Sequence, residues 1–224
     1  MAGKLYFYGV VDSFRHKGLR KKLVQELRES GIQNETILKV IEKIPRHFYI
    51  DRSFEEHAYE NKPFSIGCNQ TISNPYTVGY QTQLLNIQPG DKVLEIGTGS
   101  SYQAAVLAEL GADVYTMERH RPLSDHAKKF LKQQGYKNIK CFFGDGFAGL
   151  PEQAPFDKIL ITAGAPEIPK ALMKQLKIGG VLVLPLNKGD IQQMLRVTRM
   201  EKNRYTKETL DSFTFVPMLK GTAN

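Results

Sequence analysis

Three acidic residues follow three successive apolar segments of the chain that are predicted to be strands. Glu95, Glu118 and Asp145 each stand at or just beyond the carboxyl end of such a segment. In a doubly wound sheet, ligands bind outside the carboxyl ends of the strands. The first segment is followed by Gly97 and Gly99, which allow a tight turn and a close approach of the backbone to a ligand. These residues predict a pocket for a ligand with an amino group, a ribose and an adenine.

The residue types favour a cationic cofactor over a dinucleotide. Glu95 would repel a pyrophosphate and attract a positive charge, and Asp145 is placed to accept from an exocyclic amine. Glu118 lies about 20 residues beyond the turn, where an acidic residue takes ribose hydroxyls. Tyr102 occupies the position of the third glycine of the dinucleotide fingerprint, which keeps the helix too far away to seat a pyrophosphate. S-adenosylmethionine therefore fits better than NAD. The alternative is a purely structural turn, with the acids as surface residues.

Helical spacing dominates the chain before this pattern. It predicts helices over 17–27, 36–44 and 75–85, and a Gly- and polar-rich loop over 65–73. Gly31 is a candidate C-cap of the first helix, and Asn34 is the expected N-cap of the second, which Pro45 ends. Pro75 suits the first turn of the third helix.

From residue 92 onward, short apolar runs alternate with helical patterns. The expected strands are 93–96, 113–117, 139–143, 156–162 and 181–186, and the expected helices are 102–110, 123–134 and 170–176. This alternation calls for right-handed crossovers and a parallel sheet covered on both faces. Two more strands, 194–200 and 210–216, have no room for a helix between them and should pair as an antiparallel hairpin at one sheet edge.

The predicted fold class is therefore α/β: a Rossmann-like, doubly wound, mostly parallel sheet with a C-terminal antiparallel hairpin and an N-terminal helical extension. Residues 1–90 are expected to form the extension and a substrate and cofactor loop. Residues 91–224 are expected to form the cofactor-binding core, and the two parts to pack as one unit.

The amino-acid composition limits the possible cellular locations and binding partners of the protein. No apolar run approaches the ~18 residues that a membrane span needs. Cys68 and Cys141 are too far apart for a disulfide framework or a Cys-rich zinc module, so we expect reduced thiols and a cytoplasmic location. The net charge of +8 leaves nucleic acid or an anionic substrate open. The densest basic stretch, 15–22, is either a solvated helix face or a phosphate contact.

Two motifs carry a resemblance to a known family. Glu-Ile-Gly-Thr-Gly-Ser at 95–100 is similar to the first motif of class I methyltransferases. Ile-Gly-Cys-Asn-Gln-Thr-Ile-Ser at 66–73, together with 93–105, resembles protein-L-isoaspartate (D-aspartate) O-methyltransferases, and the similarity runs from about 44 to 217. The resemblance implies methyl transfer from S-adenosylmethionine to the free carboxylate of L-isoaspartyl or D-aspartyl residues in damaged proteins and peptides. The ester then cyclises without the enzyme to a succinimide, which partly reopens to aspartate.

The family's functional positions can be carried over by motif. Ser73 matches the active-site serine, and Gln70, Thr71 and Ile72 form with it a loop over the methionine end of the cofactor. The other matching cofactor positions are Glu95, Gly97 and Gly99 in the turn, Glu118 for the ribose, and Asp145 and Gly146 on the adenine side. Three positions depart from the family: Ser101 and Asn69 each replace a frequent Gly, and Asn74 replaces a frequent Gln or Ala. A positive φ at Ser101 would strain the turn.

The implied reaction explains which residue types are missing. A carboxylate acceptor has an unperturbed pKa of about 4 and is already ionised at neutral pH, so no general base is required. The five histidines are scattered, none forms a metal-spaced pair, and no metal is expected. Ser73 would orient the acceptor by hydrogen bonding; its alternative role is the N-cap of the helix after Pro75. Residues 215–218 either close over the ligands or form an edge strand.

Two other functions stay open at this point. A methyltransferase of the same fold acting on RNA would use the basic stretch, but the chain lacks the Asn/Asp-Pro-Pro-aromatic signature of many base methylases, so a nucleic-acid partner is not expected. A non-catalytic relative that binds S-adenosylmethionine is the other alternative. We expect a monomer with no membrane partner.

Overall fold

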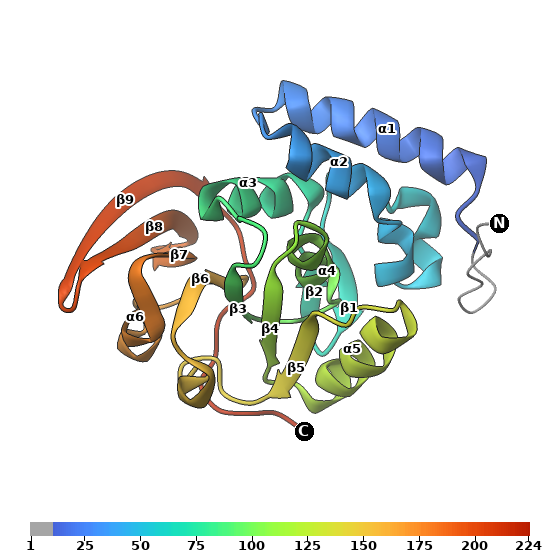
Figure 1. The fold of residues 1–224 in the computed structure, drawn as a ribbon. Coiled ribbons are helices and arrows are strands. Elements are labelled where there is room, and N and C mark those ends of the chain that lie inside the picture. The colour runs from blue at the N-terminus through green and yellow to red at the C-terminus, as the bar shows by residue number, and fades with distance from the viewer. Residues whose placement is uncertain (1–10) are drawn as a thin grey trace.

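Seven strands form the central sheet of the computed structural model, which describes residues 11–224 (Figure 1). Their order is β5-β4-β3-β6-β7-β8-β9. The strands are β3 (Lys92–Ile96), β4 (Asp113–Glu118), β5 (Ile139–Phe143), β6 (Phe156–Ile161), β7 (Leu176–Lys188), β8 (Ile191–Glu201) and β9 (Arg204–Phe213). The first five are parallel, and β8 and β9 pair antiparallel with their neighbours. The predicted mostly parallel sheet with a C-terminal hairpin is confirmed.

The hairpin differs from the prediction in its bounds. β9 ends at Phe213, whereas a strand over 210–216 was expected, because the chain turns away from the sheet after Phe213. β7 begins five residues before the expected Val181. β8 lies between β7 and β9, which settles an order that the hairpin spacing leaves open.

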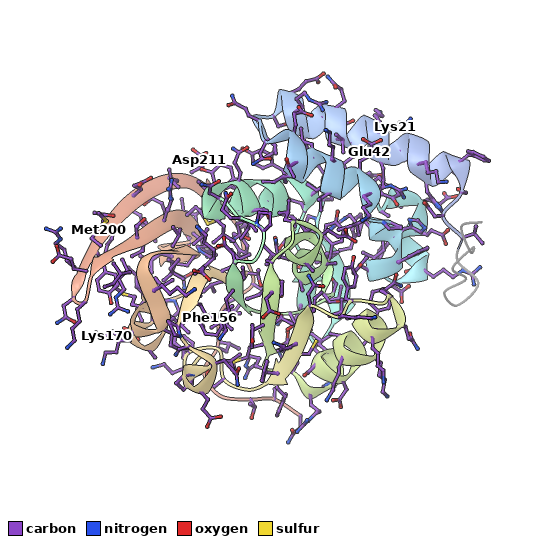
Figure 2. All side chains as sticks on the ribbon, in the orientation of Figure 1. Lys21, Glu42, Phe156, Lys170, Met200 and Asp211 are labelled. Carbon is purple, nitrogen blue, oxygen red and sulfur yellow. The ribbon has the colours of Figure 1, made fainter. Side chains whose placement is uncertain are left out.

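Helices cover both faces of the sheet. They are α3 (Pro75–Leu85), α4 (Tyr102–Glu109), α5 (Arg121–Gln133) and α6 (Lys170–Gln175), with a short 3-10 turn η3 (Pro151–Gln153). Leu85 of α3 and Leu107 of α4 pack on Val93 and its neighbours on one face, and Phe130 of α5 packs beside α4. On the other face Leu172 of α6 joins a cluster that includes the fully buried Phe156, which lies inside the molecule in Figure 2.

The N-terminal extension packs on α3. Its helices are α1 (Phe14–Glu29) and α2 (Glu35–Lys43), followed by the 3-10 turns η1 (Arg46–Tyr49) and η2 (Arg52–His57). The apolar stripe of α1 and α2 forms one cluster with Tyr76 and Tyr80 of α3. The side chain of Asn34 caps α2 as predicted, accepting from the amides of Thr36 and Ile37. None of the helices between residues 11 and 224 is long and apolar enough to cross a membrane.

The predicted loop over 65–73 is wrong: this stretch is a two-stranded hairpin. β1 (Phe64–Gly67) pairs antiparallel with β2 (Gln70–Ile72). The tip residues Cys68 and Asn69 both have positive φ, 52° and 54°, as two-residue hairpin turns require. Glycine and polar residues therefore mark a tight turn here. We call residues Phe64–Ile72 the active-site hairpin.

Candidate active site

The turn between β3 and α4 contains three residues with positive φ: Gly97 at 97°, Gly99 at 49° and Ser101 at 66°. A Cβ atom at Gly97 would overlap the hydroxyl of Thr162, which donates to the carbonyls of Ile96 (3.0 Å) and Gly97 (2.8 Å). Gly97 is therefore required by space as well as by φ. Ser101 has the left-handed conformation that favours glycine, so the strain expected at this position is present.

Glu118 joins this turn to the end of β4. One carboxylate oxygen accepts from the amide of Gly99 at 2.9 Å and the other from the amide of His120 at 2.9 Å. The side chain is 4% exposed and lines a cavity at the sheet edge. Because an ionised carboxylate has about four lone-pair sites, two remain for donors such as ribose hydroxyls.

Glu95 does not line that cavity, in contrast to the sequence-based expectation of a carboxylate facing the ligand. The side chain is fully buried; one oxygen accepts from the hydroxyl of Thr116, which in turn lies 2.6 Å from the hydroxyl of Thr98, and the other oxygen has no partner. Burial raises the pKa of Glu95 to about 8; the Thr116 hydrogen bond opposes this shift, and the charge of Glu118 adds to it. At neutral pH Glu95 is therefore largely protonated and exerts little attraction on a cation.

The two residues predicted on the adenine side, Asp145 and Gly146, differ in their position relative to the cavity. Gly146 lines the cavity, and a Cβ atom there would overlap the Ile96 side chain and lie 3.3 Å from Cε of Met218. The half-buried Asp145 is not part of the lining; its carboxylate accepts from the amide of Phe147 at 2.9 Å. Asp145 thus shapes the loop that presents Gly146.

The space between the cavity walls is about 620 Å³, open solvent at its mouth included. Its lining is Gln70, Thr71, Ile96, Gly97, Gly99, Met117, Glu118, Arg119, His120, Gly146, Thr162, Ala163 and Val216–Leu219. The sequence-based prediction missed Ile96, Met117, Arg119, His120, Thr162, Ala163 and Leu219. Thr162 follows β6, so applying the strand-end rule to that strand would have found it.

The residues present fit S-adenosylmethionine. Glu118 offers acceptor sites for ribose, and the glycines at 97 and 146 leave space that a Cβ atom would fill. Ile96, Met117 and Met218 supply apolar surface for a flat base. We call this space the cofactor cavity.

A second groove adjoins the cofactor cavity and contains Ser73. It shares Thr71, Thr162 and Val216 with the cofactor cavity. Asp211 of β9, where it passes α3 (Figure 2), hydrogen-bonds Tyr80 behind this groove. We call it the acceptor groove.

Ser73 is not the N-cap of α3. That role belongs to Asn74, whose side-chain oxygen accepts from the amide of Thr77 at 2.7 Å. The capping alternative for Ser73 is therefore wrong, and the half-buried Ser73 side chain lines the acceptor groove. Ile72 points the other way, into the core, and is 3% exposed.

The chain after β9 crosses the edge of the cofactor cavity. The amide of Gly164 donates to Val216, and the amide of Met218 donates back to Gly164, both at 2.8 Å. Farther on, Ala223 exchanges 2.8 Å backbone hydrogen bonds with the segment 119–121. Of the two sequence-based alternatives for 215–218, the edge strand is wrong, because β9 ends at Phe213, and Val216, Pro217 and Met218 instead line the cavity.

The fold brings together two histidines that are far apart in sequence. His16 and His47 stack with ring centroids 3.9 Å apart, and together with Asp12 they place ligand atoms within 4.8 Å of one another. Their spacing in the sequence is not that of a metal-binding pair and did not indicate this contact. Stacked rings do not direct their nitrogens at one ion, and both oxygens of Asp12 accept from Arg20, at 2.7 and 2.9 Å. These contacts favour a structural cluster.

The comparisons with known proteins agree with this geometry. The family model for protein-L-isoaspartate(D-aspartate) O-methyltransferase matches residues 18–223. Protein-L-isoaspartate O-methyltransferases from Cytophaga hutchinsonii and Dictyoglomus thermophilum are 51% and 46% identical to the chain, over 93% of it and over 94% and 93% of their own lengths.

Solved structures show the same fold. One protein-L-isoaspartate O-methyltransferase superimposes with a TM-score of 0.81 at 27% identity, over 88% of this chain and 65% of its own. Another, from Plasmodium falciparum and in complex with S-adenosyl-L-homocysteine, superimposes with a TM-score of 0.80 at 23% identity, over 90% of this chain and 98% of its own. The fold is that of a Rossmann-like class I methyltransferase, and the chain belongs to the protein-L-isoaspartate(D-aspartate) O-methyltransferase family.

Proposed function

We propose that this protein repairs damaged proteins by transferring a methyl group from S-adenosylmethionine to the free carboxylate of L-isoaspartyl and D-aspartyl residues. The observation that carries the proposal is the common wall of the two cavities. Thr71, Thr162 and Val216 line both the cofactor cavity and the acceptor groove. A methyl donor on one side is thereby next to an acceptor on the other.

Glu118, Gly97, Gly99 and Gly146 hold the cofactor in this proposal, with Gln70 and Thr71 of the active-site hairpin at its methionine end. When bound, the cofactor supplies an electrophilic methyl group on a sulfonium. The acceptor oxygen bonds to the methyl carbon as the sulfur–carbon bond breaks, and the electron pair of the broken bond stays on sulfur. Glu95 supports the turn from behind.

The acceptor needs orientation more than activation. Its carboxylate is ionised at neutral pH, and no charged side chain lines the acceptor groove within residues 11–224. The hydroxyl of Ser73 donates to the acceptor carboxylate and directs one oxygen toward the methyl group. Bringing an acceptor and a donor into line is worth roughly 7–11 kcal/mol in total in well-aligned reactions, and the Ser73 hydrogen bond would supply a part of it.

The test is methylation of an isoaspartyl peptide beside its normal aspartyl twin, with bulk RNA as a third acceptor. We expect labelled methyl transfer to the isoaspartyl peptide alone. Transfer to RNA alone would favour the nucleic-acid alternative, and cofactor binding without transfer to any acceptor would favour a non-catalytic relative.

Ser73→Ala tests the role of the serine, with Asn74→Ala as the matched control. Ser73→Ala should lower kcat at least tenfold with an unchanged melting temperature, because the Ser73 side chain does not cap α3. Asn74→Ala should lower the free energy of unfolding by about 1 kcal/mol, the usual cost of losing an N-cap. Loss of stability with Ser73→Ala and none with Asn74→Ala would reverse these assignments.

The proposed setting is a monomer in the cytoplasm that acts on damaged proteins and not on nucleic acid. Both Cys68 and Cys141 are free thiols, which supports a reducing compartment.

A further inference from the structure

We propose that Arg46 is a positioning residue, whose guanidinium fastens the base of the active-site hairpin and thereby sets the hairpin over the cofactor cavity. Arg46 lines neither the cofactor cavity nor the acceptor groove. The inference rests on the proposed function, because it concerns how the walls of that site are held.

The hydrogen bonds of Arg46 reach both ends of the hairpin. Nη2 donates to the carbonyl of Ser73 at 2.9 Å and to that of Lys62 at 3.4 Å, and Nε donates to the carbonyl of Ala58 at 3.0 Å. Lys62 and Ser73 flank the hairpin Phe64–Ile72 on its two sides. One nitrogen therefore holds the strand that enters the hairpin and the strand that leaves it.

The same guanidinium also contacts the cofactor turn through Tyr102. Its central carbon lies 5.1 Å from the centroid of the Tyr102 ring, a cation–π distance. Tyr102 is the first residue of α4, directly after the turn, and is 1% exposed. At the other end of the hairpin, Cδ1 of Ile66 lies 3.2 Å from the Cβ position of Gly99. The hairpin therefore lies against the turn at Ile66 and is linked to the start of α4 through Arg46.

Arg46 is buried without a carboxylate partner. It is 0% exposed, forms no ion pair within the described part of the chain, and its Nη1 has no acceptor. Burial lowers the pKa of Arg46 to about 10. Burying a charge costs free energy. An apolar side chain of similar size would avoid that cost but would leave the carbonyls of Ala58, Lys62 and Ser73 without this donor. The contribution of Arg46 therefore lies in the three carbonyls that its guanidinium holds in fixed positions.

Arg20 offers a matched control. It is also buried, at 5% exposure, and its guanidinium lies over a tyrosine ring, Tyr59, at 5.7 Å. Its partners are Asp12, Tyr59 and the carbonyl of Glu42, all in the N-terminal extension. Arg20 thus matches Arg46 in type and burial and has no contact with the hairpin.

The experiment compares Arg46→Met, Arg46→Lys and Arg20→Met with the wild type. We measure hydrogen exchange of the amides in 64–73, the affinity for S-adenosyl-L-homocysteine, and steady-state methylation of an isoaspartyl peptide. Arg46→Met should raise the hydrogen-exchange rate of the hairpin amides at least tenfold and lower kcat at least tenfold. It should also weaken the binding of S-adenosyl-L-homocysteine severalfold. Arg46→Lys should recover part of each, because an ammonium reaches one of the carbonyls. Arg20→Met should leave all three near wild type.

The proposal is overturned if Arg46→Met leaves hairpin exchange and kcat within twofold of wild type, or if Arg20→Met changes both by the same factor. If Arg46→Met does not fold, Arg46→Lys is judged by the same hairpin exchange. Failure of the proposed function would look different: the wild type would methylate no isoaspartyl peptide, while hydrogen exchange and ligand affinity would still report on Arg46.

Discussion

Two glutamates at the ends of neighbouring parallel strands, Glu95 and Glu118, occupy opposite environments. Glu118 is the last residue of β4; it reaches over the sheet edge, accepts from two backbone amides and lines the cofactor cavity. Glu95 lies one residue inside the end of β3, opposite Thr116, and is buried with one oxygen unpaired. Glu95 lies opposite Thr116, two residues before Glu118, and this difference separates an interior acid from one that lines the cavity.

The largest expected effect concerns the pH dependence of stability. The pKa of Glu95 is raised from its unfolded value near 4.5 to about 8 in the folded protein, so between these values the folded state binds more protons than the unfolded state. The stabilisation is full below pH 4.5 and is lost as pH rises toward 8, on the order of 5 kcal/mol over the window. Urea unfolding of the ligand-free protein at several pH values measures this slope.

Glu95→Gln should flatten that slope and make the protein more stable than wild type above pH 8. Gln keeps the shape of the side chain and does not ionise, so it serves as the control. If the stability of the wild type instead rises from pH 5 to pH 8 by the same amount as that of the variant, Glu95 is ionised in the folded state.

Cofactor affinity should separate the two glutamates next. Glu118→Gln removes the ionised acceptor for ribose and one partner of the amides at 99 and 120, and hydrogen bonds to a charged group are worth roughly 1.5–3 kcal/mol each. We expect about a 100-fold weaker binding of S-adenosyl-L-homocysteine by calorimetry, and a change below threefold for Glu95→Gln. Equal losses in the two variants would contradict the difference between the sites.

A smaller effect follows from Thr116, whose hydroxyl donates to Glu95 and opposes the rise in its pKa. Thr116→Val should move the pKa of Glu95 higher, so that the loss of stability extends to more alkaline pH, with a destabilisation of about 1 kcal/mol. Thr116→Ser keeps the hydroxyl and should resemble wild type. An unchanged upper limit of the pH dependence in Thr116→Val would rule out this hydrogen bond as a determinant.

The smallest effect is expected at Ser101, in the turn between the two glutamates. Its φ of 66° costs a non-glycine residue about 1–2 kcal/mol. Glycine avoids this cost but makes the unfolded chain more flexible, which lowers the free energy of unfolding by roughly 0.4–1 kcal/mol. Ser101→Gly should therefore raise stability by about 0.5 kcal/mol, read as a slightly higher Tm. Ser101→Ala keeps the Cβ atom and should gain nothing; an equal gain in both variants would assign the effect to the hydroxyl.

Local patterns in the sequence predicted most of the fold because they depend on near neighbours. Alternating strands and helices, the cap at Asn34 and the turn at Gly97 were correct for this reason. The hairpin over 65–73 was missed because two polar residues with positive φ resemble a loop in composition. The position of Glu95 depends on the register with Thr116, which only the assembled sheet defines.

Contacts between residues that are far apart in the sequence could not be predicted from local sequence patterns. Arg46 meets Ser73 across 27 positions, and His16 meets His47 across 31 positions of the printed numbering. No spacing rule connects such pairs. The motif at 66–73 located Ser73 and Thr71, and the strand-end rule applied to β6 would have located Thr162. The contact of Arg46 with the base of the hairpin is set by tertiary packing alone.

The tail at 216–223 has a consequence for biosynthesis. These residues are synthesised after every strand of the sheet, yet they form one side of the cofactor cavity and are bonded to the segments at 119–121 and 164. A nascent chain that already contains all seven strands still lacks this wall. We therefore expect a chain truncated at Phe215 to keep its sheet and to bind S-adenosyl-L-homocysteine more weakly, because one wall of the cavity is missing.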